Sequence, residues 1–311
     1  MFLRRKLTVM ATVALLSTSL LAGCSSSGEN SNGGSNGGGT ATAAEVLANK
    51  NARAAISMII DKQAYCDVIL NNGSIPTSTF TPKGLAFDNG KDYTDLTEGM
   101  GYEYNEEQAK ELWEKAKEEV GFDTVEMELL TYDHDTGKRT GEYIQSELSD
   151  LEGLTVKVSN LPFKQKLERE TNGEFDLAFS GWGADYPDPL TYLSTMQTGN
   201  QFSNQVGYNS EEYNKLIEEA MKLPITEGYA KYAEAEKLML EDGYLAPIYQ
   251  KASAYLEKDY VSGIVNNSWG ADYTYTYADV DKDDKVLNLA TSSDIPTLDL
   301  SKATDQQSFQ T

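Results

Sequence analysis

Residues 124–179 read TVEMELLTYDHDTGKRTGEYIQSELSDLEGLTVKVSNLPFKQKLERETNGEFDLAF, and this stretch decides the fold class. It opens with apolar side chains alternating with glutamates, the period-two pattern of a strand with one buried face. Two further apolar runs follow, and each is preceded by a segment with apolar residues at helical spacing. Strands that alternate with helices predict a layered α/β lobe. We expect strands at Thr124–Tyr132, Leu154–Val158 and Phe175–Phe179, separated by helices at about Gly141–Leu151 and Pro162–Thr171.

Helices are also expected on both sides of this stretch. Ala43–Leu70 carries apolar residues at helical spacing and predicts two helices broken near Asp61. Asn105–Gly121 begins with a capping residue type followed by acids and ends in glycine, so it predicts a capped helix. Thr77–Asp92 contains proline and glycine and predicts an extended loop. The remaining expected elements are helices at Leu190–Met196, Ser210–Leu223 and Glu227–Glu241 and an apolar strand at Leu245–Gln250.

The N-terminus has the pattern of a secretory signal. Met1–Cys24 reads MFLRRKLTVMATVALLSTSLLAGC, in which basic residues precede an apolar stretch and small residues precede a cysteine. Because Leu20–Cys24 looks like a lipobox, we expect a signal peptide at 1–23 and a lipid on Cys24 that anchors the protein to the membrane. The alternative is an ordinary cleaved signal. Residues 24–40 are rich in glycine, serine and asparagine, which predicts a flexible linker behind the lipidated cysteine.

Composition limits the function classes. The 311 residues include 49 acidic and 26 basic side chains, for a net charge of -23. Nucleic acid is therefore not an expected partner, because phosphate binding needs clustered basic residues. His134 is the only histidine, and Cys66 is the only cysteine besides Cys24, so we expect no metal, no cofactor, no disulfide and no enzyme. Cys66 lies in a helical pattern and is interpreted as a small buried apolar residue.

Four segments, in the same order along the chain, resemble segments of the oligopeptide- and nickel-binding receptors, the family 5 solute-binding proteins of ABC transporters. They are KNARAAISMIIDKQAYCDVILNNGSIPTSTFTPKGL (Lys50–Leu85), YNEEQAKELWEKA (Tyr104–Ala116), FDLAFSGWGADYPDPLTYL (Phe175–Leu193) and YAEAEKLMLEDGYLAPIYQKASAY (Tyr232–Tyr255). The resemblance implies a lobe like that of a type II periplasmic binding protein, with a mixed sheet flanked by helices. It also implies an extracytoplasmic protein, expected to be monomeric, that binds oligopeptides and delivers them to ABC permease subunits.

The resemblance covers only the second lobe of a two-lobe family. Lys285–Thr311 is similar to the start of a mature family member, although it stands here at the C-terminus. We therefore expect a solute-binding lobe at 41–281 and a displaced, poorly ordered first-lobe segment at 282–311. Because family members close two lobes over the ligand, the chain is expected to be a truncated or rearranged form with reduced binding.

The expected peptide-binding residues are in the motif GWGADY. Extended peptides bind through main-chain hydrogen bonds, and glycine lets one backbone approach another. The resemblance implies that Asp185 holds the α-amino group of the peptide. The alternative is a simple turn in which Trp182 and Tyr186 pack on the core and Asp185 caps the helix after Pro189. The expected contacts are Gly181, Trp182, Gly183, Asp185 and Tyr186.

Three other features carry less functional weight. Thr304–Gln306 matches a first-lobe segment that lines the cleft in the family, but without its neighbours we expect it not to contact a ligand. Asp279, Asp281 and Asp283 begin like a calcium loop, yet the required glycine and glutamate are missing. Tyr273, Tyr275 and Tyr277 alternate and are expected to share one face of a strand, stacking on neighbouring structure.

Two other function classes remain open. The chain could be an adhesin-like surface lipoprotein that has kept the fold and lost transport. In that case, replacing Asp185 would change nothing. An extracytoplasmic hydrolase has little support, because the sequence offers no evident pairing of a nucleophile with a base.

Overall fold

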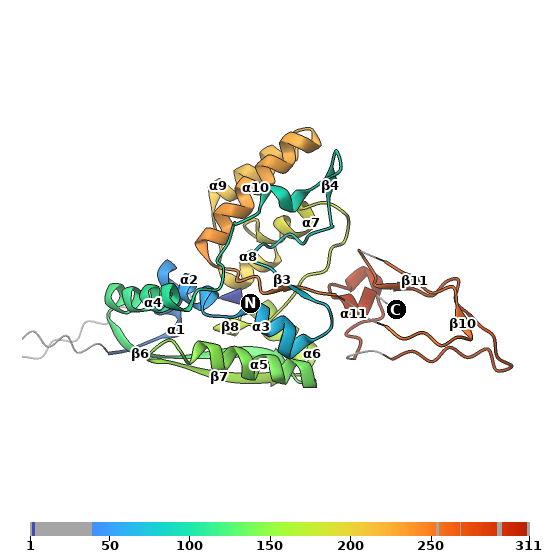
Figure 1. Ribbon diagram of the computed structural model, residues 1–311, viewed down its shortest axis with the longest axis horizontal. Helices are drawn as coiled ribbons and strands as arrows, with labels where there is room; N and C mark the ends of the chain where they lie inside the picture. Colours follow the sequence, from blue (N-terminus) through green and yellow to red (C-terminus); the bar gives the residue numbers. More distant parts are fainter. Residues whose placement is uncertain (1, 4–38, 253–254, 268, 291–293, 310–311) are drawn as a thin grey trace, which may run out of the picture.

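The computed structural model describes residues 2–3, 39–252, 255–267, 269–290 and 294–309, which form an α/β layer, a group of helices beside it and a protruding C-terminal arm (Figure 1). Most of the predicted signal peptide and linker, including Cys24, lies outside the described residues. Among the helices in the described ranges, none combines the length and apolar character needed to cross a bilayer.

The sheet is built around its longest strand, β6 (Phe122–Tyr132). β7 (Leu154–Leu161) runs parallel along one edge of β6, with Val125 opposite Leu154 and Tyr132 opposite Leu161. The other edge carries β2 (Gly39–Ala41) near its start and β8 (Leu177–Ala178) near its end, both parallel to β6. β1 (Phe2–Leu3) pairs antiparallel with β8. The three strands predicted within residues 124–179 are confirmed, although β8 is shorter than expected and β2 begins within the predicted linker. Of the strand predicted at Leu245–Gln250, only Tyr249–Gln250 forms one.

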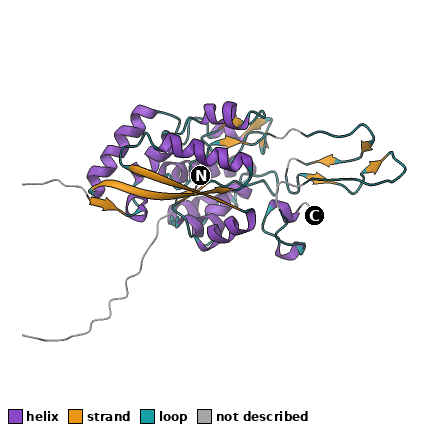
Figure 2. Ribbon diagram, turned by 90° about the horizontal axis from the view of Figure 1, so that it is seen from below, coloured by secondary structure: helices purple, strands orange, loops and turns teal. Residues whose placement is uncertain are grey.

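The connections between these strands are helical, as predicted, and helices lie on both sides of the sheet (Figure 2). α5 joins β6 to β7, and α6 joins β7 to β8. α4 ends where β6 begins, and its predicted caps are present: the Asn105 side chain accepts the amide of Gln108, and Gly121 has φ +82°. The helices of this part are α1 (Ala43–Leu47), α2 (Lys50–Met58), α3 (Lys62–Ala64), the π-helix η1 (Tyr65–Leu70), α4 (Glu106–Val120), α5 (Asp135–Leu148) and α6 (Phe163–Asn172).

Side-chain alternation along the strands divides the interior into two apolar clusters. On β6, Met127 and Leu129 face a cluster with α2, α4 and α5, whereas Leu130 faces a cluster with the other helices. On β8, Leu177 faces the first cluster and Ala178 the second. β8 and the end of β6 are therefore buried on both faces, as expected for parallel strands between helices. Cys66 is buried in the first cluster, which confirms its interpretation as an apolar core residue.

The second cluster belongs to the group of helices after β8. One of these helices, α8, was not predicted, because its sequence QFSNQV has few apolar residues and no side-chain cap. A long segment between η1 and α4 runs beside this group and contains only short elements, in agreement with the predicted loop. The elements are α7 (Leu190–Leu193), η3 (Ser194–Met196), α8 (Gln201–Val206), α9 (Glu211–Ala220), α10 (Ile225–Asp242), β3 (Ile75–Pro76) paired with β9 (Tyr249–Gln250), β4 (Phe87–Asp88) paired with β5 (Lys91–Asp92), and η2 (Tyr93–Leu96).

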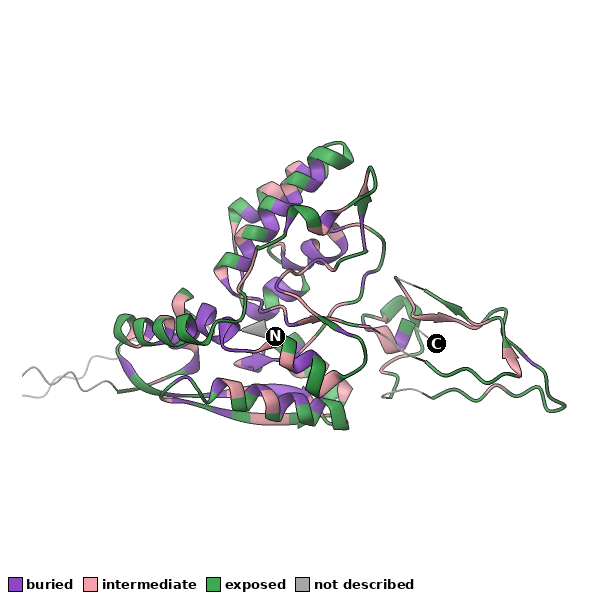
Figure 3. Ribbon diagram, viewed as in Figure 1, coloured by how far each residue is buried: buried purple, intermediate pink, exposed green. Residues whose placement is uncertain are grey.

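The C-terminal arm extends away from the rest of the molecule and is largely exposed (Figure 3). The predicted single strand through three tyrosines is wrong: β12 ends at Thr274, Tyr273 and Tyr275 stack with ring centroids 6.2 Å apart, and Tyr277 is 74% exposed. The arm consists of β10 (Val261–Ser262) paired with β13 (Asp279–Val280), β11 (Val265–Asn266) paired with β12 (Tyr273–Thr274), η4 (Leu300–Lys302) and α11 (Gln306–Phe309).

Candidate functional site

A cavity of about 780 Å³ lies where β6 and β8 end and the helical group begins. Its wall includes the side of α6, the chain that follows β8, and parts of α7 and α8. The loop after β3 and the segment around β9 complete it, together with residues of the arm. Ligand sites in open α/β sheets typically occupy this position outside the carboxyl ends of parallel strands. The volume is in the range of cavities that hold small organic ligands.

The chain leaving β8 presents backbone to the cavity at Gly181 and Gly183. A Cβ atom on Gly181 would meet nothing within 4 Å, and one on Gly183 would lie 3.4 Å from Oε1 of Gln306. Among the described residues, neither glycine amide has a hydrogen-bond partner. Trp182 between them is held from behind, since its indole N–H donates to the carbonyl of Thr191 at 2.8 Å and its carbonyl accepts the Tyr192 hydroxyl at 3.2 Å. The two glycines therefore offer free amides on a fixed support.

Asp185 lines the same cavity and has an exposed side chain. Its backbone amide donates to the Thr191 hydroxyl at 2.9 Å, which orients the residue. Partial burial raises the pKa of its carboxyl group, and no cation pairs with it in the described part of the chain. Before α7 it is the carboxylate of Asp188, and not that of Asp185, that accepts the amide of Leu190, at 2.9 Å. The capping role considered for Asp185 is therefore wrong.

Trp182 and Tyr186, the aromatic residues of the motif, lie in different environments. Trp182 borders the cavity and also packs edge to face on Phe202, with ring centroids 5.3 Å apart. Phe80 adds a second wall, because it packs edge to face on Tyr192 at 5.3 Å. Tyr186 is 41% exposed and does not border the cavity, so the structure does not place this predicted contact in the site. The wall next to Asp185 is consequently aromatic.

A buried polar cluster under Gly181 was not predicted. Lys166 donates to the carboxylate Oε1 of Glu170 at 2.5 Å and to the hydroxyl of Ser180 at 2.6 Å, and that hydroxyl also contacts Oε1. The side chains of Lys166 and Glu170 are 0% and 5% exposed. In sequence, a lysine and a glutamate four residues apart look like a solvated helix pair. The three side chains therefore form one buried hydrogen-bonded cluster.

The arm also reaches the cavity. Thr304, Asp305 and Gln306 all border it. That they do not contact a ligand stays a prediction. The side-chain amide of Gln306 donates to the carbonyl of Gly270 at 2.8 Å and to the carboxylate of Asp272 at 3.1 Å. These bonds hold α11 against the turn between β11 and β12. The contact could not be predicted from the sequence, because it joins residues that are 36 and 34 positions apart in the chain.

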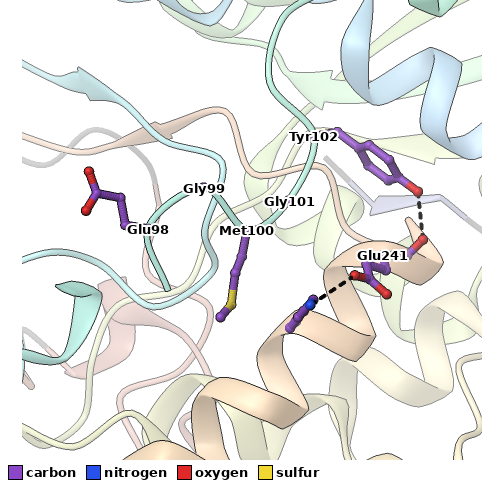
Figure 4. Close-up of a pocket in the computed structure, with 7 residues that line it drawn as sticks. Glu98, Gly99, Met100, Gly101, Tyr102 and Glu241 are labelled. Atoms are coloured by element: carbon purple, nitrogen blue, oxygen red, sulfur yellow. Dashed lines mark hydrogen bonds and ion pairs between the residues drawn. The ribbon is translucent and has the colours of Figure 1, made fainter. Parts of the chain in front are cut away.

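A second, smaller cavity of about 310 Å³ lies between residues 98–102 and α10 (Figure 4). Tyr102 closes one side, with its hydroxyl donating to the carbonyl of Glu241 at 2.7 Å. Lys237 lies 3.8 Å from the Glu241 carboxylate on the helix. None of the predicted site residues borders this cavity. The larger cavity therefore remains the candidate site.

The fold and the cavity define the class of protein. It is an α/β lobe whose cavity is bordered by the free backbone amides of Gly181 and Gly183 and by the carboxylate of Asp185. Residues 28–204 match the profile of the bacterial extracellular solute-binding proteins, family 5 (middle region), and the chain belongs to this family. The match covers the first three resembling segments noted in the sequence and confirms the α/β lobe.

Individual relatives agree. The chain is 31% identical over 238 residues to a dipeptide-binding protein of Lactococcus lactis, covering 74% of this chain and 43% of the relative. It is similar in structure to Listeria monocytogenes OppA bound to peptide, with a TM-score of 0.71, 37% identity and coverage of 76% of this chain and 46% of that one. A solved peptide-binding protein of a peptide ABC transporter, 36% identical with a TM-score of 0.63, is covered to 93% by 67% of this chain. The chain thus spans less than half the length of the first two proteins.

Proposed function

We propose that this chain is the peptide-binding component of an ABC importer and binds short peptides in the 780 Å³ cavity. The observation that carries the proposal is the line of free backbone amides at Gly181 and Gly183 ending at the unpaired carboxylate of Asp185. Amides suit the carbonyl groups of an extended peptide, and a carboxylate suits its ammonium group. The names of the relatives, which are dipeptide- and oligopeptide-binding proteins, support the same ligand class.

The 311 residues alone are proposed to bind peptide weakly. Solute-binding proteins reach high affinity by closing two lobes over a ligand. This chain spans 43% of the length of the Lactococcus relative. We expect dissociation constants on the order of 10 μM to 1 mM, between those of tight receptors and those of nonspecific contact.

Calorimetry and NMR titration of the purified chain with defined short peptides test both statements. Peptides with a free amino terminus should bind in this weak range, and their N-acetylated forms should bind less. Sub-micromolar affinity would overturn the proposal of a reduced site. No binding of any peptide at millimolar concentration would overturn the proposed function itself.

The location of the protein is part of the proposal. We propose that the signal peptide directs export and that a lipid on Cys24 holds the protein at the outer face of the membrane, where permease subunits can receive its ligand. Metabolic labelling with a fatty-acid analogue should label the wild-type protein and not a Cys24→Ala variant. Equal labelling of the two proteins would contradict the assignment of Cys24.

A further inference from the structure

The buried cluster of Lys166, Glu170 and Ser180 borders the proposed peptide site and has one unused acceptor. Both contacts of the Glu170 carboxylate go to a single oxygen, Oε1. Among the described residues, no partner is present for the other oxygen, Oε2, and Glu170 has no further interaction. Oε2 is not fully enclosed by the protein and keeps some accessible surface. Glu170 is one of the residues that border the cavity.

The surroundings make Oε2 a rigid acceptor. Lys166 has a completely buried side chain, and its ammonium group lies 4.3 Å above the centre of the Tyr132 ring. Its bonds to Glu170 and Ser180 hold the carboxylate in one orientation. Binding of a ligand group to Oε2 therefore costs no further side-chain entropy of Glu170. A hydrogen bond to a charged acceptor is also about twice as strong as one to a neutral acceptor.

The charge balance indicates what kind of donor this oxygen takes. Lys166 and Glu170 form an ion pair with almost no solvent contact, so the pair has little net charge to attract a second cation. Asp185 borders the same cavity, and no cation pairs with it among the described residues. A neutral N–H donor thus suits Glu170, whereas a cation suits Asp185.

We propose that Oε2 of Glu170 is a second ligand contact in the cavity and accepts a hydrogen bond from an N–H group of the bound peptide, foremost a main-chain amide. This rests on the proposed function, because it needs a peptide in the cavity. Ser180 joins the two sites physically: it contacts Glu170 and directly precedes Gly181. The peptide would then meet donors at the glycines and an acceptor at Glu170, which matches the alternating donors and acceptors of an extended main chain.

The test is a scan in which each main-chain amide of a binding peptide is methylated in turn. One N-methyl peptide should bind the wild-type protein roughly tenfold more weakly than its parent, as loss of a charge-assisted hydrogen bond implies. The same methyl group should cause no such loss in the double variant Lys166→Met/Glu170→Leu, which removes the acceptor without leaving a buried unpaired charge. Glu168→Gln, an exposed change on the same helix, is the matched control and should behave like wild type.

A second series uses a peptide built of norleucine residues and replaces them by lysine, one position at a time. A gain in affinity that disappears in the double variant would assign the donor to a side-chain ammonium instead of an amide, and would still support Oε2 as the acceptor. If neither series separates the double variant from wild type, while the parent peptide binds normally, the Glu170 contact is refuted and the proposed function is not. If the parent peptide does not bind wild type, the proposed function fails first.

Discussion

The carboxylate of Glu236 accepts the backbone amide of Thr81 at 2.9 Å and the hydroxyl of the same residue at 2.8 Å. It also accepts the amide of Phe80 at 2.8 Å and the hydroxyl of Tyr93 at 3.0 Å. The group is completely buried on α10, and burial raises its pKa while these four bonds oppose the rise. Phe80 forms a wall of the large cavity, so one buried acid on a helix positions a loop that shapes the site.

Glu236→Gln should lower the free energy of unfolding by about 2 to 4 kcal/mol, because the amide group turns a donor toward donors and leaves buried groups unsatisfied. Urea denaturation measures this. Glu234→Gln, an exposed change on the same helix, should stay within about 0.5 kcal/mol of wild type. Equal effects of the two changes would show that the buried bonds contribute nothing specific.

Asp185→Asn should weaken the binding of peptides with a free amino terminus by roughly 10- to 100-fold, the size expected for loss of a charge-assisted bond to an ammonium group. N-acetylated peptides lack that group and should bind the variant and the wild type alike. Asp150→Asn, an exposed change after α5, serves as the control in the same titrations. A variant that keeps full affinity for free-amine peptides would remove Asp185 from the site and favour a protein that does not bind peptides for transport.

Gly101→Ala should destabilise the protein by more than about 2 kcal/mol. Gly101 has φ +82°, and a Cβ atom there would lie 2.1 Å from the carbonyl oxygen of Ser78, so the backbone must move. Gly99 has φ +72° but would place its Cβ in open space, so Gly99→Ala measures the cost of the backbone conformation alone, about 1 kcal/mol. Thermal or urea unfolding of both variants separates the two contributions, and equal losses would contradict the close contact.

Lys62 predicts a pH dependence of stability. Burial lowers the pKa of Lys62 from 10.5 to about 8, although its ammonium donates to the Ser78 hydroxyl at 2.9 Å and the Tyr102 carbonyl at 2.6 Å. Between these two pKa values the unfolded chain binds a proton that the folded chain does not, so the free energy of unfolding should rise with pH from about 8 upward. Buried tyrosines such as Tyr65, whose pKa is raised by burial, oppose this rise only above their ordinary value of 10.

Urea unfolding at a series of pH values between 7 and 10, roughly the window set by these pKa values, checks this expectation. Lys62→Met should flatten the rise while shifting the whole curve, because two acceptors lose their donor. An unchanged slope in the variant would assign the pH dependence to other groups.

Much of the fold could be predicted because its signals are local. The helix Glu106–Val120 follows from its caps and its apolar spacing, and β6 follows from its period-two pattern. The motif at Gly181–Asp185 could also be predicted, and the structure places it at a cavity. α8 could not, since its residues bury Phe202 and Val206 only through contacts made by distant segments.

What the sequence determined by itself is the order of strands and helices, the α/β class and the polar motif after β8, because backbone preference and apolar periodicity act over a few residues. Only the tertiary structure decided which charges are buried. Glu236, Lys166 and Glu170 look like surface residues of amphipathic helices, yet all three are buried and hydrogen-bonded, and Glu170 borders the cavity. The physical reason is that burial and hydrogen-bond partners depend on chain segments far apart in sequence, such as Thr81 and Glu236, which meet only after the layers have packed.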